Sequence, residues 1–272
     1  MGNRKLIALD LDGTLLNSEK TISKALYDGL HEAIDQDNII AITTGRSVNS
    51  ANIVTSDFDL TGKNCFILAF QGNLLYDQEK KKTIFTECLD EDDAIYVMKK
   101  LLDAGVYAHT YTEDCLHSPR DCKELQDYTV VTKDPIEFFS DVEELRGLSM
   151  PKIIAIDYED HDKLKRFEKE IADYADGRLE HFFSTPDYLE FVKADSNKGS
   201  GVLKLAELLG IDREDVIAIG DERNDISMIE AAGLGVAMAN GREEAKAVAD
   251  YITENDNNHD GVLEVLKKFV LR

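Results

Sequence analysis

The sequence predicts an α/β protein with a Rossmann-like, three-layer core, in which helices cover both faces of a parallel sheet, and an α+β domain inserted into that core. Three observations support this prediction. Short apolar runs alternate with helical periodicity at both ends of the chain, turn motifs rich in Asp, Gly and Thr follow several of these runs, and the middle of the chain breaks the rhythm.

The first third predicts strands and helices in alternation. Apolar runs bounded by turn residues predict strands at 5–9, 38–42 and 66–70. Apolar spacing predicts a helix at 23–36, with Thr21 or Ser23 as its N-cap, and a short helix at 48–54. A hairpin is expected to follow, with strands at 74–76 and 83–85.

The last third returns to this alternation. A helix at 199–209 is expected to end at Gly210, a residue that suits a C-cap. The elements predicted after it are strands at 216–219, 234–238 and 251–253, helices at 225–232 and 245–248, and an amphipathic helix at 261–271.

The middle third predicts a mixture of elements with polar loops between them. Helices are expected at 93–104 and 162–174, and strands at 106–111, 152–156 and 179–184. We therefore divide the chain into a split core, residues 1–86 and 192–272, and an inserted domain, residues 87–191. The charge follows this division, because the insert holds 12 basic and 27 acidic residues.

The composition argues against several classes of partner. The chain has 272 residues, with 31 Lys and Arg against 54 Asp and Glu, which gives a net charge of −23. This balance disfavours nucleic acid and anionic membrane surfaces as partners. No targeting segment or membrane span is recognised, and four cysteines do not form a disulfide scaffold, so we expect a cytoplasmic protein. No oligomeric state is predicted.

The segment Asp10-Leu11-Asp12-Gly13-Thr14 directly follows the first predicted strand. Because residues two apart on a strand face the same side, Asp10 and Asp12 are both expected at the carboxyl end of the sheet, where open α/β sheets bind ligands. Two close carboxylates suit a nucleophile beside a general acid, with Mg²⁺ between them. Gly13 permits a sharp turn. The alternative is an Asp-Gly turn with solvated carboxylates.

Two further segments lie where a predicted strand ends or a helix begins. Thr43-Thr44-Gly45-Arg46 combines a hydroxyl group with backbone N–H groups that open a helix, which predicts an anion site, although a helix cap has the same pattern. Lys198 begins a helix, where its charge opposes the helix dipole. This placement is favourable if Lys198 faces an anion or carboxylates, and an ordinary solvated lysine is the alternative.

The fourth segment is Gly220-Asp221-Glu222-Arg223-Asn224-Asp225, after the predicted strand at 216–219. Asp221 lies at the end of that strand and can supply an oxygen to a metal ion. Asn224 and Asp225 begin a helix, where a carboxylate is favoured, so Asp225 is also explained as a cap.

Together and in this order, the four segments resemble the motifs of the haloacid dehalogenase superfamily: DLDGT at 10–14, TTGR at 43–46, KG at 198–199 and GDERND at 220–225. The insert is similar in place and size to the large C2-type cap of the Cof-type subfamily. QGNLLYD at 71–77, VAMANG at 236–241, and Thr253 and Asn255 before DGV at 260–262 add to the resemblance. Two loops depart from it, at Gln71-Gly72-Asn73 and Ala239-Asn240-Gly241.

The resemblance implies a Mg²⁺-dependent phosphatase that hydrolyses small phosphate monoesters, such as sugar phosphates or related metabolites. It makes Asp10 the nucleophile that forms an aspartyl phosphate, and Asp12 the general acid and then the general base. It assigns the metal to Asp10, the backbone carbonyl of Asp12 and Asp221. It assigns the phosphoryl oxygens to Thr44, Lys198, Asn224 and backbone amides near Leu11 and Gly45. Asp225 would orient Lys198 or a metal-bound water, and the cap would choose the leaving group.

Several alternatives stay open. A phosphomutase would use the same nucleophile, and a non-catalytic protein that binds a phosphorylated metabolite would keep the binding groups. Arg46 is expected either to reach a substrate phosphate or to pair with a surface acid. Cys115, His117 and Cys122, with His109 nearby, have irregular spacing, which favours loop and core residues over a zinc site. Tyr107, Tyr111, Phe138 and Phe139 are predicted in the core of the insert. The acidic insert predicts a preference for monophosphates over triphosphates.

Overall fold

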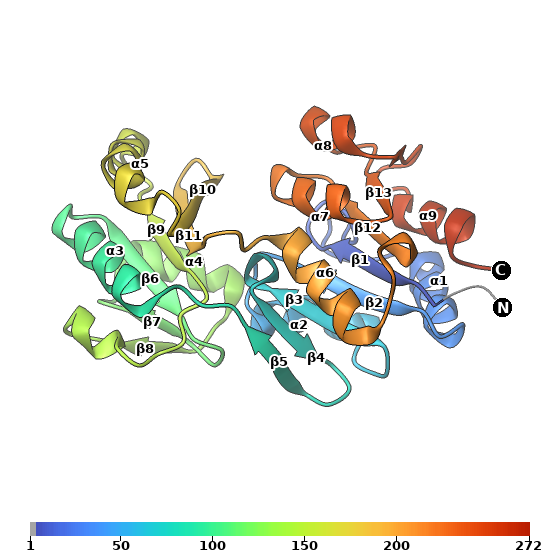
Figure 1. Ribbon diagram of the computed structural model, residues 1–272, viewed down its shortest axis with the longest axis horizontal. Coiled ribbons are helices and arrows are strands. Elements are labelled where there is room, and N and C mark those ends of the chain that lie inside the picture. Colours follow the sequence, from blue (N-terminus) through green and yellow to red (C-terminus); the bar gives the residue numbers. More distant parts are fainter. Residues whose placement is uncertain (1–3) are drawn as a thin grey trace. The chain divides into compact units, whose positions relative to one another are not determined.

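The computed structural model describes residues 4–272 and divides the chain into two compact units (Figure 1). Among the described residues, the core unit comprises 4–85 and Asn197–Arg272, and the inserted unit comprises Thr86–Ser196. The second break therefore follows Ser196, whereas the sequence placed it after residue 191. The reason is β11, Tyr188–Lys193, which pairs within the sheet of the inserted unit.

The core unit is built on a sheet of eight strands among the described residues, in the order β14-β13-β12-β1-β2-β3-β4-β5. Neighbouring strands from β14 to β3 are parallel, and β4 pairs antiparallel with β3. This is the α/β sheet that the sequence predicts. The strands are β1 Leu6–Asp10, β2 Ile39–Thr43, β3 Cys65–Ala69, β4 Leu74–Asp77, β5 Lys82–Thr86, β12 Val216–Gly220, β13 Leu234–Ala237 and β14 Tyr251–Ile252.

Helices flank this sheet. Apolar side chains of α6 and α7 pack with those of β1, β2 and β12 in one buried cluster, and α6 and α7 lie in front of the sheet in Figure 1. Helix α1 packs against both α9 and β2. The helices of the core unit are α1 Lys24–Asp35, α2 Val48–Thr55, α6 Lys198–Leu209, α7 Ile226–Ala231, α8 Glu243–Val248 and α9 Gly261–Phe269, with short 3-10 turns at Ser56–Phe58, Phe70–Gly72, Arg213–Asp215 and Arg223–Asp225.

Side-chain caps fix where α1 and α6 begin, and a glycine fixes where α6 ends. The hydroxyl of Ser23, one of the two predicted caps, accepts the N–H of Leu26 at 3.0 Å. Before α6, the side chain of Asn197 accepts the N–H of Ser200 at 3.0 Å, and the Ser200 hydroxyl accepts the N–H of Asn197 at 3.0 Å. This reciprocal cap makes Lys198 the first helical residue. Gly210 ends α6 with φ of 65°, as its position in the sequence predicts.

The inserted unit is an α+β unit whose sheet has the order β10-β11-β9-β6-β7-β8 among the described residues. Its pairs are antiparallel except for β7 with β8. Apolar residues of α3 and α5 form its core together with β6, β9 and β11. Its elements are α3 Glu91–Asp103, β6 Tyr107–Tyr111, β7 Leu116–Ser118, α4 Lys123–Thr132, β8 Ile136–Phe138, a 3-10 turn at Val142–Leu145, β9 Ile153–Ile156, α5 His161–Ala175, β10 Leu179–Thr185 and β11 Tyr188–Lys193.

The sequence missed β7, α4, β8 and β11 of the inserted unit. Strands β7 and β8 have three residues each, too few for a periodic pattern. Helix α4 exposes Val130 and Val131, so it shows no clear apolar stripe. The prediction for Phe138 was wrong, because its side chain is 58% exposed on the edge strand β8. Tyr107, Tyr111 and Phe139 are buried as predicted.

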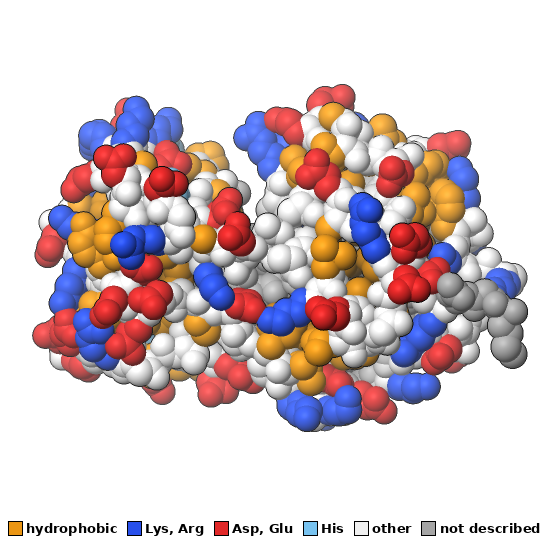
Figure 2. Space-filling view, viewed as in Figure 1, with side chains coloured by type: hydrophobic (Ala, Val, Ile, Leu, Met, Phe, Trp, Pro, Cys, Tyr) orange, Lys and Arg blue, Asp and Glu red, His pale blue; other side chains and the backbone are white. Residues whose placement is uncertain are grey.

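The negative charge of the inserted unit lies on its surface among basic groups. Figure 2 shows acidic and basic side chains interleaved on the visible face of this unit. Arg146, for example, contacts the carboxylates of Glu91, Asp92 and Glu143. Exposed pairs of this kind contribute little to stability, so this charge is a surface property. Within residues 4–272, every helix is too short or too polar to cross a bilayer.

We predict that Gly199→Ala destabilises the core unit. A Cβ at Gly199 would lie 2.3 Å from the backbone oxygen of Ser227 in α7, and backbone cannot move aside as a flexible side chain does. We expect a loss of about 1–3 kcal/mol in the free energy of unfolding, measured by urea denaturation. Gly62→Ala is the matched control, since a Cβ there meets nothing within 4 Å. Equal stability of the two variants would contradict the close approach of α6 to α7.

Candidate active site

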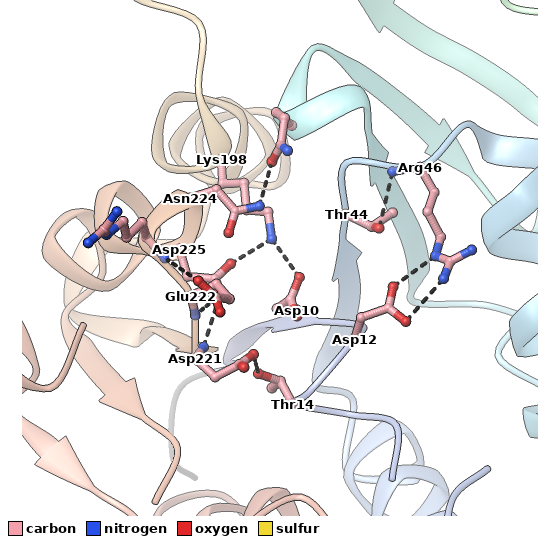
Figure 3. Close-up of polar contacts among 12 residues, drawn as sticks. Asp10, Asp12, Thr14, Thr44, Arg46, Lys198, Asp221, Glu222, Asn224 and Asp225 are labelled. Carbon is pink, nitrogen blue, oxygen red and sulfur yellow. Dashed lines mark hydrogen bonds and ion pairs between the residues drawn. The ribbon is translucent and has the colours of Figure 1, made fainter. Parts of the chain in front are cut away.

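Three neighbouring parallel strands bring predicted site residues to one edge of the core sheet. Strand β1 ends at Asp10, which is in register with Thr43 at the end of β2. Strand β12, on the other side of β1, ends at Gly220, and Asp221 follows it. Since β2, β1 and β12 run in the same direction, the residues after their carboxyl ends face a common site (Figure 3).

Lys198 lies at the centre of this site. Its side chain is fully buried, and its Nζ donates to Oδ1 of Asp10 and to Oδ1 of Asp225, each at 2.5 Å. Burial opposes the charged form of Lys198, but the two carboxylates outweigh it and raise the pKa of the ammonium group. Lys198 is therefore a charged, ion-paired residue and not a solvated surface lysine.

Asp225 joins Lys198 to the backbone after β12. Its Oδ2 accepts the N–H groups of Asp221 and Glu222, both at 2.9 Å, while its Oδ1 accepts from Lys198. Both oxygens are thus engaged, and the residue is completely buried. These contacts hold Lys198 and the turn that carries Asp221 in fixed positions, which is the arrangement expected if Asp225 orients Lys198.

Three carboxylates crowd around the single positive charge of Lys198. Oxygens of Asp10, Asp221 and Asp225 all lie within 4.8 Å of one another. Burial, reinforced by the charge of Asp225 and opposed by Lys198, raises the pKa of Asp10 well above its ordinary value. Burial likewise raises the pKa of Asp221 to about 6, despite a hydrogen bond from Thr14. The site therefore carries more negative charge than its own lysine neutralises.

The turn after β1 is shaped to admit Asp221. Gly13 has φ of 90°, and a Cβ there would lie 2.5 Å from Oδ2 of Asp221, so both conformation and space require glycine. Thr14 donates its hydroxyl to Oδ1 of Asp221 at 2.8 Å. The side-chain amide of Asn240, in a loop that departs from the family pattern, donates to the backbone oxygen of Gly13 at 2.8 Å. This loop thus has a visible role in holding the turn.

Asp12 points away from Lys198 in Figure 3, toward Arg46. The Arg46 guanidinium binds both carboxylate oxygens, with Nε 2.8 Å from Oδ2 and Nη2 3.0 Å from Oδ1. Lys20 adds a contact from its Nζ to Oδ1 at 2.7 Å. Burial raises the pKa of Asp12, but these hydrogen bonds outweigh it and the net shift is downward. Of the two roles predicted for Arg46, the structure shows pairing with an acid, and that acid is Asp12.

The remaining predicted residues line the loops beside these carboxylates. Thr44 is buried, and its hydroxyl accepts the N–H of Arg46 at 3.2 Å. The side chain of Leu11 is in the core, so its backbone is what a ligand can reach. Asn224 is exposed and donates to Oε1 of Gln71 at 3.1 Å. Gly45 also lies close to Gln71, because a Cβ at Gly45 would be 2.7 Å from Nε2 of Gln71.

Gln71 is a member of this site that the sequence did not assign. It follows β3, is buried, and has φ of 62°, directly after Phe70 with φ of 50°. Two successive left-handed residues other than glycine are strained, and strain of this kind concentrates at functional sites. The sequence held one indication of this role: Gln71 directly follows a predicted strand, at a position where the family usually has asparagine.

The donor set fits a hard divalent cation. Carboxylate oxygens of Asp10 and Asp221 are the ligand type that Mg²⁺ prefers, and both are nearly buried at a strand end. Asp225 fits this role less well, because both of its oxygens already accept hydrogen bonds. The surplus of negative charge around Lys198 gives a cation a favourable electrostatic environment.

Comparison with known proteins agrees with this geometry. The model of the family described as haloacid dehalogenase-like hydrolase matches residues 7–266. YxeH of Bacillus subtilis (strain 168) is 31% identical over 269 residues, which cover 98% of each chain. The 5-amino-6-(5-phospho-D-ribitylamino)uracil phosphatase YwtE of the same strain is 30% identical over 283 residues, 95% of each chain.

A solved structure extends the likeness to the fold of the whole chain. The crystal structure of a haloacid dehalogenase-like hydrolase from Bacteroides thetaiotaomicron has a TM-score of 0.87 and 31% identity, and the match covers 98% of this chain and 99% of that one. The four motifs, their meeting at one sheet edge and these matches lead to the same conclusion. The chain belongs to the haloacid dehalogenase-like hydrolases, as a phosphatase of the Cof type.

Proposed function

We propose that this phosphatase is Mg²⁺-dependent and hydrolyses small phosphorylated metabolites, such as sugar phosphates, through an aspartyl phosphate on Asp10. The observation that carries the proposal is the buried contact between Lys198 and Asp10, at the end of the central strand β1. The relative YwtE, whose name gives it a phosphate on a ribityl chain as substrate, supports this substrate class.

Asp10 is the nucleophile in this proposal. A carboxylate oxygen of Asp10 attacks phosphorus, the bond from phosphorus to the ester oxygen breaks, and the leaving oxygen takes a proton from Asp12. A water molecule then attacks the aspartyl phosphate and gives a proton to Asp12, which releases phosphate and restores Asp10. Lys198 opposes the rise in the pKa of Asp10 that burial and Asp225 cause, and a cation at the site would favour the ionised nucleophile further. Lys198 also adds positive charge where the phosphoryl oxygens gather.

Asp10, Asp221 and the backbone carbonyl of Asp12 are the groups that would hold Mg²⁺. When bound, the ion supplies positive charge beside the nucleophile and the phosphoryl group. Asp225, with both oxygens engaged, holds Lys198 and the Asp221 turn in place. The hydroxyl of Thr44 and backbone N–H groups near Leu11 and Gly45 would bind the phosphoryl oxygens, with Asn224 at their edge.

Asp12 must change its contacts to act as an acid. In the structure it is held ionised by Arg46 and Lys20, which leaves it without a proton to give. A phosphate dianion nearby competes for the guanidinium of Arg46 and, as a like charge, disfavours the ionised form of Asp12. Substrate itself thus promotes the protonation that the first step requires. The inserted unit is proposed to act as the family's cap, which selects the leaving group.

We predict that Asp10→Asn abolishes turnover, because an amide is a very poor nucleophile. Phosphate release would be measured over a broad panel of phosphate esters with Mg²⁺, with Asp57→Asn, at an exposed position of the same unit, as the control. We expect activity at background for the first variant and at the wild-type level for the second. Wild-type turnover by Asp10→Asn would exclude the assigned nucleophile, and isomerised sugar phosphate with little free phosphate would indicate a mutase.

The role of Asp12 predicts a dependence on the leaving group. For alkyl phosphates, whose leaving oxygen needs a proton, Asp12→Asn should lower kcat/KM by about 10²–10⁴-fold. For p-nitrophenyl phosphate, whose leaving group is stable as an anion, the loss in kcat/KM should be much smaller. An equal loss for both kinds of ester would show that Asp12 does not donate the proton.

The crowding of carboxylates predicts that Asp221→Asn stabilises the protein when divalent metal is removed by a chelator. Since the pKa of Asp221 is raised to about 6, its negative charge is less favourable in the folded state than in the unfolded state at pH 8. We expect a gain of about 1–2 kcal/mol in the free energy of unfolding. The gain should diminish as the pH falls through about 6, where the wild-type carboxyl takes up a proton.

Mg²⁺ should reverse this order, because it stabilises the wild type more than the variant that lacks one of its ligands. Asp212 is an exposed aspartate before the same strand, and Asp212→Asn is the control. It should leave the free energy of unfolding unchanged both with the chelator and with Mg²⁺. A loss of stability in chelated Asp221→Asn would contradict the surplus of negative charge that we infer.

A further inference from the structure

A second group of potential metal ligands lies in the inserted unit, far in sequence from the four motifs. The thiol of Cys115, a ring nitrogen of His117 and a carboxylate oxygen of Glu137 all lie within 4.8 Å of one another. Cys115 and His117 are two residues apart at the start of β7, and Glu137 on β8 is in register with His117. The sheet therefore brings three different ligand types together.

The spacing of the Cys115 and His117 atoms is close to that of a tetrahedral zinc site, because Sγ of Cys115 is 3.3 Å from Nε2 of His117. Oε2 of Glu137 is 3.7 Å from Nδ1, the other nitrogen of the ring, so Glu137 must change its rotamer to share an ion on the Nε2 side. With Zn–S of about 2.3 Å and Zn–N of about 2.0–2.1 Å, neighbouring ligand atoms in a tetrahedron lie about 3.5 Å apart. The side chain of Glu137 is 70% exposed, so it can adjust its rotamer without disturbing the core.

The chemistry of the three groups favours a borderline metal over Mg²⁺. Burial lowers the pKa of His117, so its ring is neutral and offers a lone pair. Burial raises the pKa of Cys115, so a metal ion must displace the thiol proton. Thiolate and imidazole select Zn²⁺, whereas Mg²⁺ prefers oxygen ligands throughout. The hydroxyl of Thr112 also lies beside the group, 3.2 Å from Nε2 of His117.

We propose that Cys115, His117 and Glu137 bind one Zn²⁺ ion, with water as the fourth ligand. The ion would tie the turn between β6 and β7 to the edge strand β8, and so stabilise the side of the sheet that has the shortest strands. The three ligands differ from the residues of the candidate active site, so the proposal does not rest on the phosphatase mechanism. Cys122, which the sequence placed beside Cys115 and His117, lies outside the group.

Co²⁺ is the probe that tests this site, because a thiolate bound to Co²⁺ gives a charge-transfer absorption that oxygen ligands do not give. The reduced full chain is titrated with Co²⁺ in excess Mg²⁺, which occupies carboxylate sites. We expect the absorption to saturate at one equivalent and to vanish when Zn²⁺ is added. Because one thiol proton is released, affinity should rise about tenfold per pH unit.

Four variants test which side chains hold the ion. Cys115→Ser should abolish the absorption, His117→Gln and Glu137→Gln should weaken Co²⁺ binding by more than about tenfold, and Cys122→Ser should change nothing. If Cys115→Ser fails to fold, the His117 and Glu137 variants, which keep the thiol, decide the question. If the wild type gives no such absorption, the three side chains contact one another but bind no metal ion, and the proposal is wrong. An absorption that persists in Cys115→Ser, or is lost in Cys122→Ser, would also overturn the assignment.

Discussion

The buried contact of Lys198 with Asp10 and Asp225 is the interaction on which the rest of the site depends. A lysine at a helix N-terminus and in the protein interior is unfavourable on both counts, and removing one partner from such a buried group costs about 3–5 kcal/mol. Strand β1 must therefore end where α6 begins. The glycine at 199, which admits the backbone of α7, and the cap at Asn197 bring α6 into that position.

The same interaction leaves a charge imbalance that links structure to function. One lysine faces three carboxylates, which is why we propose that the site accepts a cation beside an anionic substrate. Asp12 stays outside this cluster, paired with Arg46 and Lys20, and in the proposed mechanism this pairing keeps it apart from the nucleophile until substrate arrives. Two carboxylates only two residues apart thus have opposite pKa shifts, which suits the different roles proposed for them.

The sequence located the residues that lie at ends of buried strands, and the reason is physical. Asp10, Thr44 and Asp221 follow continuous apolar runs, so the sheet edge could be inferred from pattern alone. The partner of Arg46 could not be inferred, because the contact joins two loops whose backbone path has no periodic signal. Gln71 was not assigned to the site, because a glutamine in the sequence does not indicate that its backbone is left-handed. Glu137 was not recognised as a possible ligand, because a strand of three residues is too short for the sequence to indicate which residues it pairs with.

The central claim is that phosphate passes through Asp10 in two successive in-line displacements. The stereochemical course at phosphorus tests this claim most directly, with a thiophosphate ester whose non-bridging positions hold sulfur and two oxygen isotopes, hydrolysed in water that carries the third isotope. Each displacement inverts the configuration, so the account predicts overall retention in the transfer from ester to the accepting oxygen. Overall inversion would show that water attacks the ester directly, and would contradict Asp10 as the nucleophile.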